Sequence, residues 1–240
     1  MGKRKKGNSY LLQGEYGFLL QPVLRRLFSQ ITIPDLYRKS VSGLAEKGHI
    51  VFVHSITSTI DGMLMNYRFS REGLPSPKIV FGKKFIFLQP LRGLMTLLAS
   101  PFASLSSPFE NEFYKEFLLD EGNASVISLD MTSARQGADP ILELLKIQRD
   151  TERPIYLLPQ RIVYRRAPLK IKDVTSEEKA SIKASGKIMT LLKAQEHGFL
   201  EHGEPINLKD VIKKEQGGSK FFEEVATEVR NDLMQQLASL

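Results

Sequence analysis

The sequence contains neither cysteine nor tryptophan among its 240 residues. The absence of cysteine excludes disulfide bonds and thiolate metal sites, and it permits a reducing compartment without requiring one. The chain also lacks a P-loop, a dinucleotide fingerprint and an H-E-x-x-H zinc motif. His49, His197 and His202 have no carboxylate or second histidine at a ligand spacing, so we predict no metal site and no cofactor.

No apolar run follows the basic residues 3–6, so the sequence predicts no secretory signal peptide. The chain carries 34 lysines and arginines against 27 acidic residues, a net charge of +7. This balance suits an anionic partner. Composition alone does not choose among a phosphate ligand, an acidic carrier, anionic lipid and nucleic acid. Of these, nucleic acid is the weakest alternative and is not expected as a partner, because no recognition motif is present and the basic residues are spread along the chain.

Apolar strand-like runs alternate with amphipathic helical stretches along the chain, which predicts an α/β sandwich. Helices are expected to begin at Pro34 and at Asp139-Pro140, both typical starting signals. We divide the chain into a basic tail with an N-terminal helical segment (1–33), an α/β domain (34–216) and a C-terminal amphipathic helix (217–240). The last helix is a candidate for docking a partner.

The most informative stretch covers residues 51–91. The apolar residues 50–53 predict a buried strand that ends at His54, and a hydroxyl-rich turn leads to Asp61 and a helix over 62–70. Residues 78–81 predict a second strand. A histidine and an aspartate therefore follow the carboxyl end of a strand, where open α/β sheets place their ligand sites.

This layout, LAEKGHIVFVHSITSTID followed by NYRFSREGLPSP and KKFIFLQPL, resembles the glycerol-3-phosphate acyltransferase family. A later segment, RPIYLLPQRIVY over 153–164, is similar to a strand block of the same enzymes. The resemblance covers roughly residues 44–168. It implies an acyltransferase-like α/β sandwich with a mixed central sheet flanked by helices. The implied activity is the transfer of a fatty acyl group from acyl-CoA or acyl carrier protein to the 1-hydroxyl of glycerol 3-phosphate, in phospholipid biosynthesis.

The sequence departs from the family at its H-x-x-x-x-D motif. If Asp61 is the motif aspartate, Ile56 occupies the family's histidine position, and His54 is the nearest histidine. Two interpretations stay open. His54 is the base that removes the acceptor's proton, with Asp61 holding the imidazole, or His54 merely ends a strand and Asp61 caps a helix. The second fits a catalytically inactive, membrane-associated binding or scaffold domain, alone or as part of a longer enzyme.

The resemblance also implies basic residues that hold the acceptor phosphate, since arginine binds phosphate in a bidentate manner. The glycine- and arginine-rich substrate block of the family is replaced here by SLDMTSARQG over 128–137. The alternative for each basic candidate is an exposed solubilising charge, and the alternative for Ser58 is a cap of the helix that follows it. The candidate substrate-binding residues are Ser58, Arg68, Arg71, Lys83 and Arg135.

Residues 85–105 form the most apolar segment of the chain. Pro90, Arg92 and Pro101 argue against a continuous membrane-spanning helix. A helix packed on the protein's own core and an element lying in the membrane interface both stay open. Together with the basic tail, this segment predicts a peripheral or monotopic protein on the cytoplasmic face of the cell membrane, with an anionic membrane surface as a partner.

Overall fold

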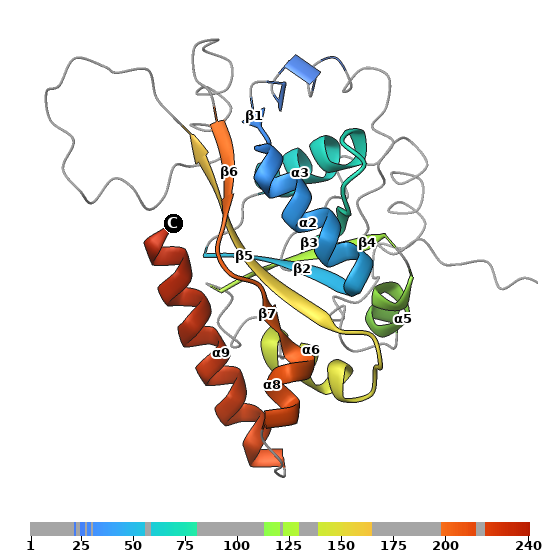
Figure 1. Ribbon diagram of the computed structural model, residues 1–240, viewed down its shortest axis with the longest axis vertical. Helices are drawn as coiled ribbons and strands as arrows, with labels where there is room; N and C mark the ends of the chain where they lie inside the picture. Colours follow the sequence, from blue (N-terminus) through green and yellow to red (C-terminus); the bar gives the residue numbers. More distant parts are fainter. Residues whose placement is uncertain are drawn as a thin grey trace, which may run out of the picture.

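The computed structural model describes residues 22, 25–26, 28–29, 31–55, 59–80, 113–120, 122–129, 139–164, 198–214 and 219–240. Within these ranges the chain forms helices and strands in alternation (Figure 1). They are β1 (Ile31–Thr32), α2 (Asp35–Lys47), β2 (His49–His54), α3 (Thr59–Arg71), β3 (Ser76–Val80), α5 (Phe113–Leu119), β4 (Asn123–Ser128), α6 (Pro140–Arg149), β5 (Ile155–Tyr164), β6 (Gly198–His202), β7 (Ile206–Asn207), α8 (Leu208–Lys214) and α9 (Ser219–Ser239).

The strands form one mixed sheet in the order β1-β6-β5-β2-β4-β3, with β7 paired to β5. Strand β2 lies parallel to both β4 and β5, and β3 lies parallel to β4. Strands β6 and β7 run antiparallel to β5. The predicted α/β class with a mixed central sheet is therefore confirmed.

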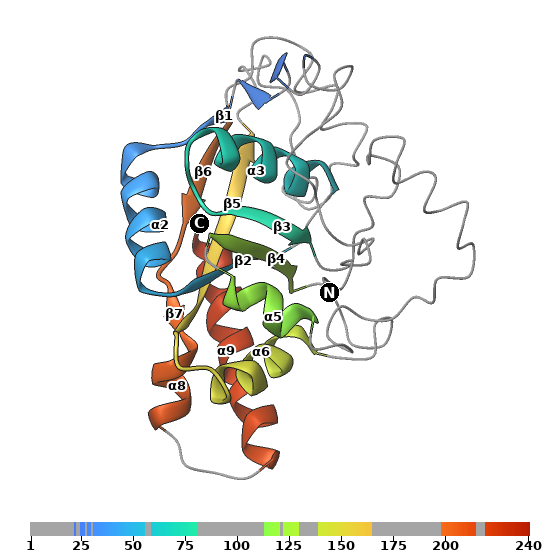
Figure 2. The same ribbon diagram turned by 90° about the vertical axis from the view of Figure 1, so that its right-hand side faces the viewer.

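Helices cover both faces of the sheet and enclose two apolar cores. Helices α2 and α3 pack on the face that carries Ile50 and Phe52 of β2. Helices α5, α6, α8 and α9 pack on the face that carries Val51 and Val53. Figure 2 shows α3 above strands β3 and β4, with α5, α6 and α9 below them. The continuous apolar run of β2 is explained by this burial, because successive side chains point to opposite faces and both faces are covered.

Local signals explain where several helices begin. Pro34 is the N-cap residue of α2, and the side chain of Asp139 accepts a hydrogen bond from the backbone N–H of Ile141 at 3.0 Å, at the start of α6. Arg230 of α9 forms an ion pair with Asp139 at 2.6 Å, so the same carboxylate also joins α9 to α6.

Strand β5 differs from the sequence expectation. Pro159 predicts an edge strand, a bulge or two short strands, whereas the structure has one strand of ten residues. The strand changes neighbours near this proline: residues 155–159 pair with β2, and residues 160–164 pair with β6. Pro159 has no N–H to donate, which is tolerated at the point where the strand changes neighbours. Its carbonyl still accepts a hydrogen bond from the N–H of Gly203 at 2.9 Å.

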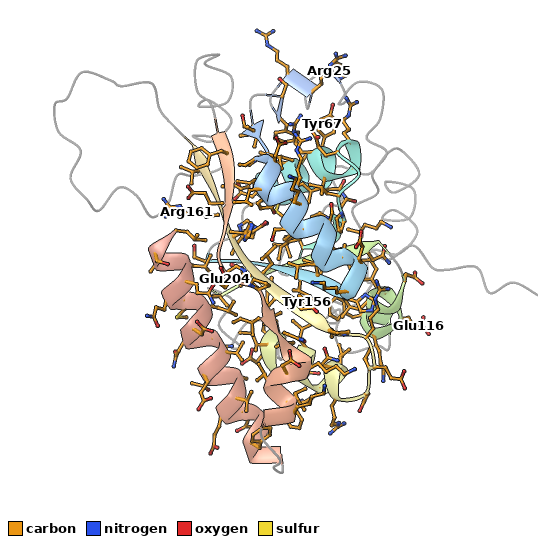
Figure 3. All side chains as sticks on the ribbon, in the orientation of Figure 1. Arg25, Tyr67, Glu116, Tyr156, Arg161 and Glu204 are labelled. Carbon is orange, nitrogen blue, oxygen red and sulfur yellow. The ribbon has the colours of Figure 1, made fainter. Side chains whose placement is uncertain are left out.

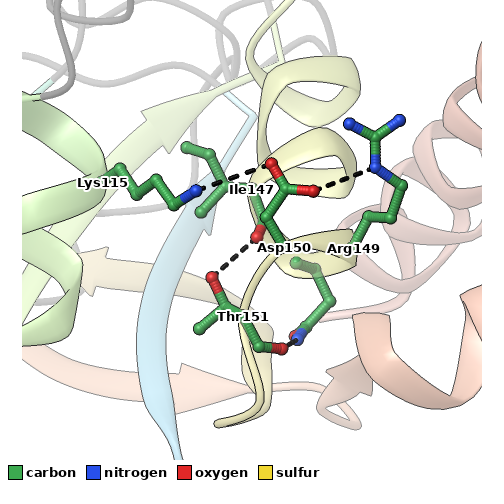
Figure 4. Close-up of polar contacts among 6 residues, drawn as sticks. Lys115, Ile147, Arg149, Asp150 and Thr151 are labelled. Atoms are coloured by element: carbon green, nitrogen blue, oxygen red, sulfur yellow. Dashed lines mark hydrogen bonds and ion pairs between the residues drawn. The ribbon is translucent and has the colours of Figure 1, made fainter.

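A surface network closes the carboxyl end of α6 (Figure 4). Asp150 accepts hydrogen bonds from Arg149 at 3.0 Å and from Lys115 of α5 at 3.5 Å. The hydrogen bond from Arg149 is the main cause that lowers the pKa of Asp150, and the positive charges of Arg149 and Lys115 add to it. Because the pairs are exposed, we expect them to add less than about 1 kcal/mol to stability.

The C-terminal helix α9 packs on the chain's own core through Val225, Val229, Leu233 and Leu237. The apolar stripe that made it a candidate for partner docking is therefore covered by α6 and β5. Of the helices in the described residues, none is both long and apolar enough to cross a membrane. The apolar segment 85–105 lies outside the described residues.

Candidate functional site

Three buried polar side chains lie side by side at the carboxyl edge of the parallel strands. His54 is the last residue of β2 and is in register with Ser128, the last residue of β4. On its other side β5 continues from Pro159, the register partner of Val53, to Gln160. His54 is 4% exposed, Ser128 3% and Gln160 0%. Polar groups enclosed this completely are stable only when they are hydrogen-bonded.

Gln160 connects three secondary-structure elements through its side-chain amide. Its Oε1 accepts a hydrogen bond from the hydroxyl of Tyr37 in α2. Its Nε2 lies 2.9 Å from Nε2 of His54 and 3.1 Å from the sulfur of Met65 in α3. Burial raises the pKa of Tyr37 well above its ordinary value, so the phenol keeps the proton that it donates to Gln160.

Asp61 lies in the same buried layer. It is 3% exposed and stands in the first turn of α3, where the helix dipole stabilises a negative charge. Asp61 and Met65 are four residues apart, so they share one face of α3, about 6 Å apart along the helix axis. Met65 contacts Gln160, and Gln160 contacts His54. The structure therefore brings His54 and Asp61 to the same edge and the same face of the sheet.

Backbone contacts join the ends of β2 and β4. The N–H of Leu129 donates to the carbonyl of His54 at 2.9 Å, and the hydroxyl of Ser128 donates to the carbonyl of Ser55 at 3.2 Å. Together these hydrogen bonds hold the residue that follows β2 against the end of β4. His54 is therefore anchored through its backbone as well as through its ring.

Arg68 and Arg71 lie toward the other end of α3. They follow Asp61 by seven and ten residues, which is about 10 and 15 Å along a helix axis. Arg68 pairs with Glu72 at 3.1 Å, and Glu72 also pairs with Arg38 of α2 at 2.7 Å. Arg71 stacks over the ring of Tyr67, 4.6 Å from its centroid. Figure 3 shows Tyr67 at the end of the molecule that also carries Arg25.

The other candidate ligands, Ser58, Lys83 and Arg135, fall outside the described residues. The phosphate-binding roles of all five candidates stay predictions. The contacts of Arg68 and Arg71 show what these side chains do in this conformation: one bridges two helices through a shared carboxylate, and the other covers an aromatic ring. Neither contact lies at the His54 end of α3.

Two further histidines differ sharply in environment. His49, at the opposite end of β2, is 3% exposed, and its Nε2 has no hydrogen-bond partner among the described residues. Burial, together with the positive charge of Arg153, lowers the pKa of His49 to about 4. His202 donates from Nδ1 to the carbonyl of Gly203 at 2.8 Å, and its ring meets Tyr37 edge-on. Within the described part of the chain, no three acidic or histidine side chains are grouped as metal ligands.

Sequence reasoning did not identify Tyr37, Met65, Ser128 or Gln160 as parts of this site. One local signal was present for Gln160: an amide that directly follows the buried apolar residues LLP of a strand requires a polar partner. The partners themselves are distant, since Gln160 follows Tyr37 by 123 residues and His54 by 106.

Comparisons with known proteins add no assignment. The chain matches no family model, no curated protein and no solved structure.

Proposed function

We propose that the protein transfers a fatty acyl group from acyl-CoA or acyl carrier protein to the 1-hydroxyl of glycerol 3-phosphate. The observation that carries the proposal is the joint burial of His54 and Asp61 at the carboxyl edge of β2, the edge where α/β sheets bind ligands. The resemblance of residues 44–168 to glycerol-3-phosphate acyltransferases supports the substrate class.

In the proposed reaction His54 removes the proton from the acceptor hydroxyl. The alkoxide oxygen attacks the thioester carbonyl, so that a C–O bond forms and the C–S bond breaks. The thiolate that leaves takes the proton from the imidazolium. Asp61 is proposed to stabilise that imidazolium, because a buried carboxylate favours a positive charge close to it.

The phosphate of the acceptor requires basic ligands near His54. Lys83 and Arg135 are the proposed ligands. Arg68 and Arg71 lie about 10 and 15 Å from Asp61 along the axis of α3, so they contact the phosphate only if the bound acceptor spans that distance. Substituting Arg135 with Gln is expected to raise the KM for glycerol 3-phosphate. Substituting Arg71 with Gln is expected to leave it unchanged.

A thiol-release assay tests the proposed activity. We expect release of free CoA from a long-chain acyl-CoA to increase when glycerol 3-phosphate is added, and the increase to disappear in His54→Gln and in Asp61→Asn. His49→Gln is the matched control, because His49 is a buried histidine five residues away on the same strand, about 16 Å from His54. Loss of release in His49→Gln as well would indicate a general effect on folding.

One observation favours a second function. The Nε2 atom of His54 is already engaged by the Gln160 amide, and the ring is almost fully buried. An acceptor hydroxyl has to replace that amide before His54 can act as a base. The second candidate is therefore a catalytically inactive, acyltransferase-like domain that binds these ligands. Calorimetric binding of glycerol 3-phosphate, with no thiol release from either acyl-CoA or acyl carrier protein, would select this function.

Either function is proposed to operate at the cytoplasmic face of the cell membrane, since a long-chain acyl donor and its product both partition into lipid. The basic residues 3–6 and the apolar segment 85–105 are the proposed contacts with an anionic surface. Sedimentation with anionic liposomes tests this location. Equal recovery of the protein in the supernatant with and without liposomes would exclude it.

A further inference from the structure

The side chain of Gln160 makes contacts that specify its own orientation. The sulfur of a thioether carries no hydrogen and can only accept, so the amide atom 3.1 Å from Met65 is the nitrogen. The amide oxygen consequently faces Tyr37, whose hydroxyl donates to it. All four groups of this cluster are buried, and the three side chains around Gln160 come from α2, α3 and β2.

This orientation determines which ring nitrogen of His54 carries the proton. The amide nitrogen of Gln160 has two hydrogens, and two acceptors lie within reach: the Met65 sulfur at 3.1 Å and Nε2 of His54 at 2.9 Å. For the second contact to be a hydrogen bond, Nε2 has to be the unprotonated nitrogen of a neutral imidazole. The proton of the ring then resides on Nδ1.

We propose that Gln160, oriented by Tyr37 and Met65, is a positioning residue that fixes His54 in its Nδ1-protonated tautomer with Nε2 as the basic nitrogen. This inference rests on the proposed function for its catalytic meaning, because a general base requires a defined lone pair. The tautomer itself is a property of the resting protein and is measurable without any activity. Gln160 touches His54 and no reacting atom, so it acts through the histidine.

The same contact makes Gln160 a competitor of the acceptor hydroxyl for the lone pair of Nε2. One Gln160 hydrogen leaves His54 when a hydroxyl group arrives, while Met65 and Tyr37 continue to hold the amide. The cluster thus keeps the base in the correct protonation state and protected from solvent until the acceptor binds.

Nitrogen NMR of protein labelled with ¹⁵N at histidine tests the positioning role. The sequence has four histidines, and the spectrum of His54→Gln assigns the signals of His54. At neutral pH we expect a pyridine-type Nε2 and a pyrrole-type Nδ1 at His54. A pyrrole-type Nε2, or signals averaged between the two tautomers, would overturn the proposal.

Gln160→Glu tests the same role by replacing the donor with an acceptor, since a carboxylate has a similar shape but can only accept a hydrogen bond from His54. We expect Nε2 of His54 to become protonated in this variant and to remain unprotonated in Gln235→Glu, where an exposed glutamine of α9 is changed. If Gln160→Glu does not fold, Gln160→Met retains the side-chain length without a donor, and we expect it to show a mixture of tautomers. A His54 that stays purely Nδ1-protonated in the folded variant would show that Gln160 does not determine the tautomer.

The outcomes separate this inference from the proposed function. The expected tautomer without thiol release supports the positioning role and rejects the acyl transfer. Thiol release that depends on His54, together with a pyrrole-type Nε2 in the resting protein, supports the acyl transfer and rejects the role of Gln160.

Discussion

Acidification is expected to destabilise the fold through His49. The ring is buried with an unpartnered Nε2 among the described residues, and its pKa of about 4 lies below the 6.5 of an unperturbed histidine. Between these two values the unfolded chain binds a proton that the folded protein does not bind. The contribution of His49 to stability is therefore fully present above about pH 6.5. It falls as the pH is lowered toward 4, and below that pH His49 causes no further loss.

The size of this loss follows from the gap between the two pKa values. One pKa unit corresponds to about 1.36 kcal/mol, so the largest possible loss of unfolding free energy is about 3 kcal/mol. Part of this shift comes from the charge of Arg153, a partly exposed side chain whose interaction with His49 is screened by solvent. We therefore expect a loss of about 2 kcal/mol.

Urea unfolding of the wild type and of His49→Phe, measured from pH 7 to pH 4, isolates the contribution of His49. All other titrating groups are common to the two proteins and cancel in the difference between their unfolding free energies. We expect the fall in pH to lower the unfolding free energy of the wild type by about 2 kcal/mol more than that of His49→Phe. Two pH profiles that stay parallel throughout would refute the reasoning.

Two matched pairs of substitutions test the packing by thermal or urea unfolding. Leu233→Ala, at a fully buried position of α9, is expected to cost 2–5 kcal/mol, roughly the range for such truncations, whereas Met234→Ala at a position 46% exposed should cost less than about 1 kcal/mol. In Gly48→Ala the new Cβ would stand 2.2 Å from the carbonyl oxygen of Pro154, so we expect a loss of about 3 kcal/mol. In Gly43→Ala the new Cβ would meet no atom of the described residues within 4 Å beyond its own helix backbone and chain neighbours, so this change should instead stabilise α2 by about 0.5–1 kcal/mol. Equal effects within either pair would contradict the packing described here.

The elements that the sequence predicts well are those with local signals. The apolar run 50–53 forms a buried strand, and Pro34 and Asp139 start their helices, all as expected. The continuous course of β5 through Pro159 was not predictable in this way. It depends on an exchange of neighbours with β2 and β6, which are separated from β5 along the sequence.

The candidate site was predictable only in part for the same reason. His54 and Asp61 are close in sequence, and a strand followed by a helix brings them to one edge. Gln160 reaches His54 because β5 pairs with β2, a contact that no local pattern contains. The positions of Arg68 and Arg71 follow from helix geometry alone, since a helix that returns across the sheet carries its later residues away from that edge.

The most direct test of the central claim is the conversion of labelled glycerol 3-phosphate and a long-chain acyl-CoA or acyl carrier protein into 1-acylglycerol 3-phosphate. The wild type and His49→Gln are expected to form the labelled product at equal rates. His54→Gln is expected to form at least about 100-fold less, the smallest contribution typical of a positioned general base. Product formation by His54→Gln at the wild-type rate, or no product from the wild type with either donor, would contradict the account.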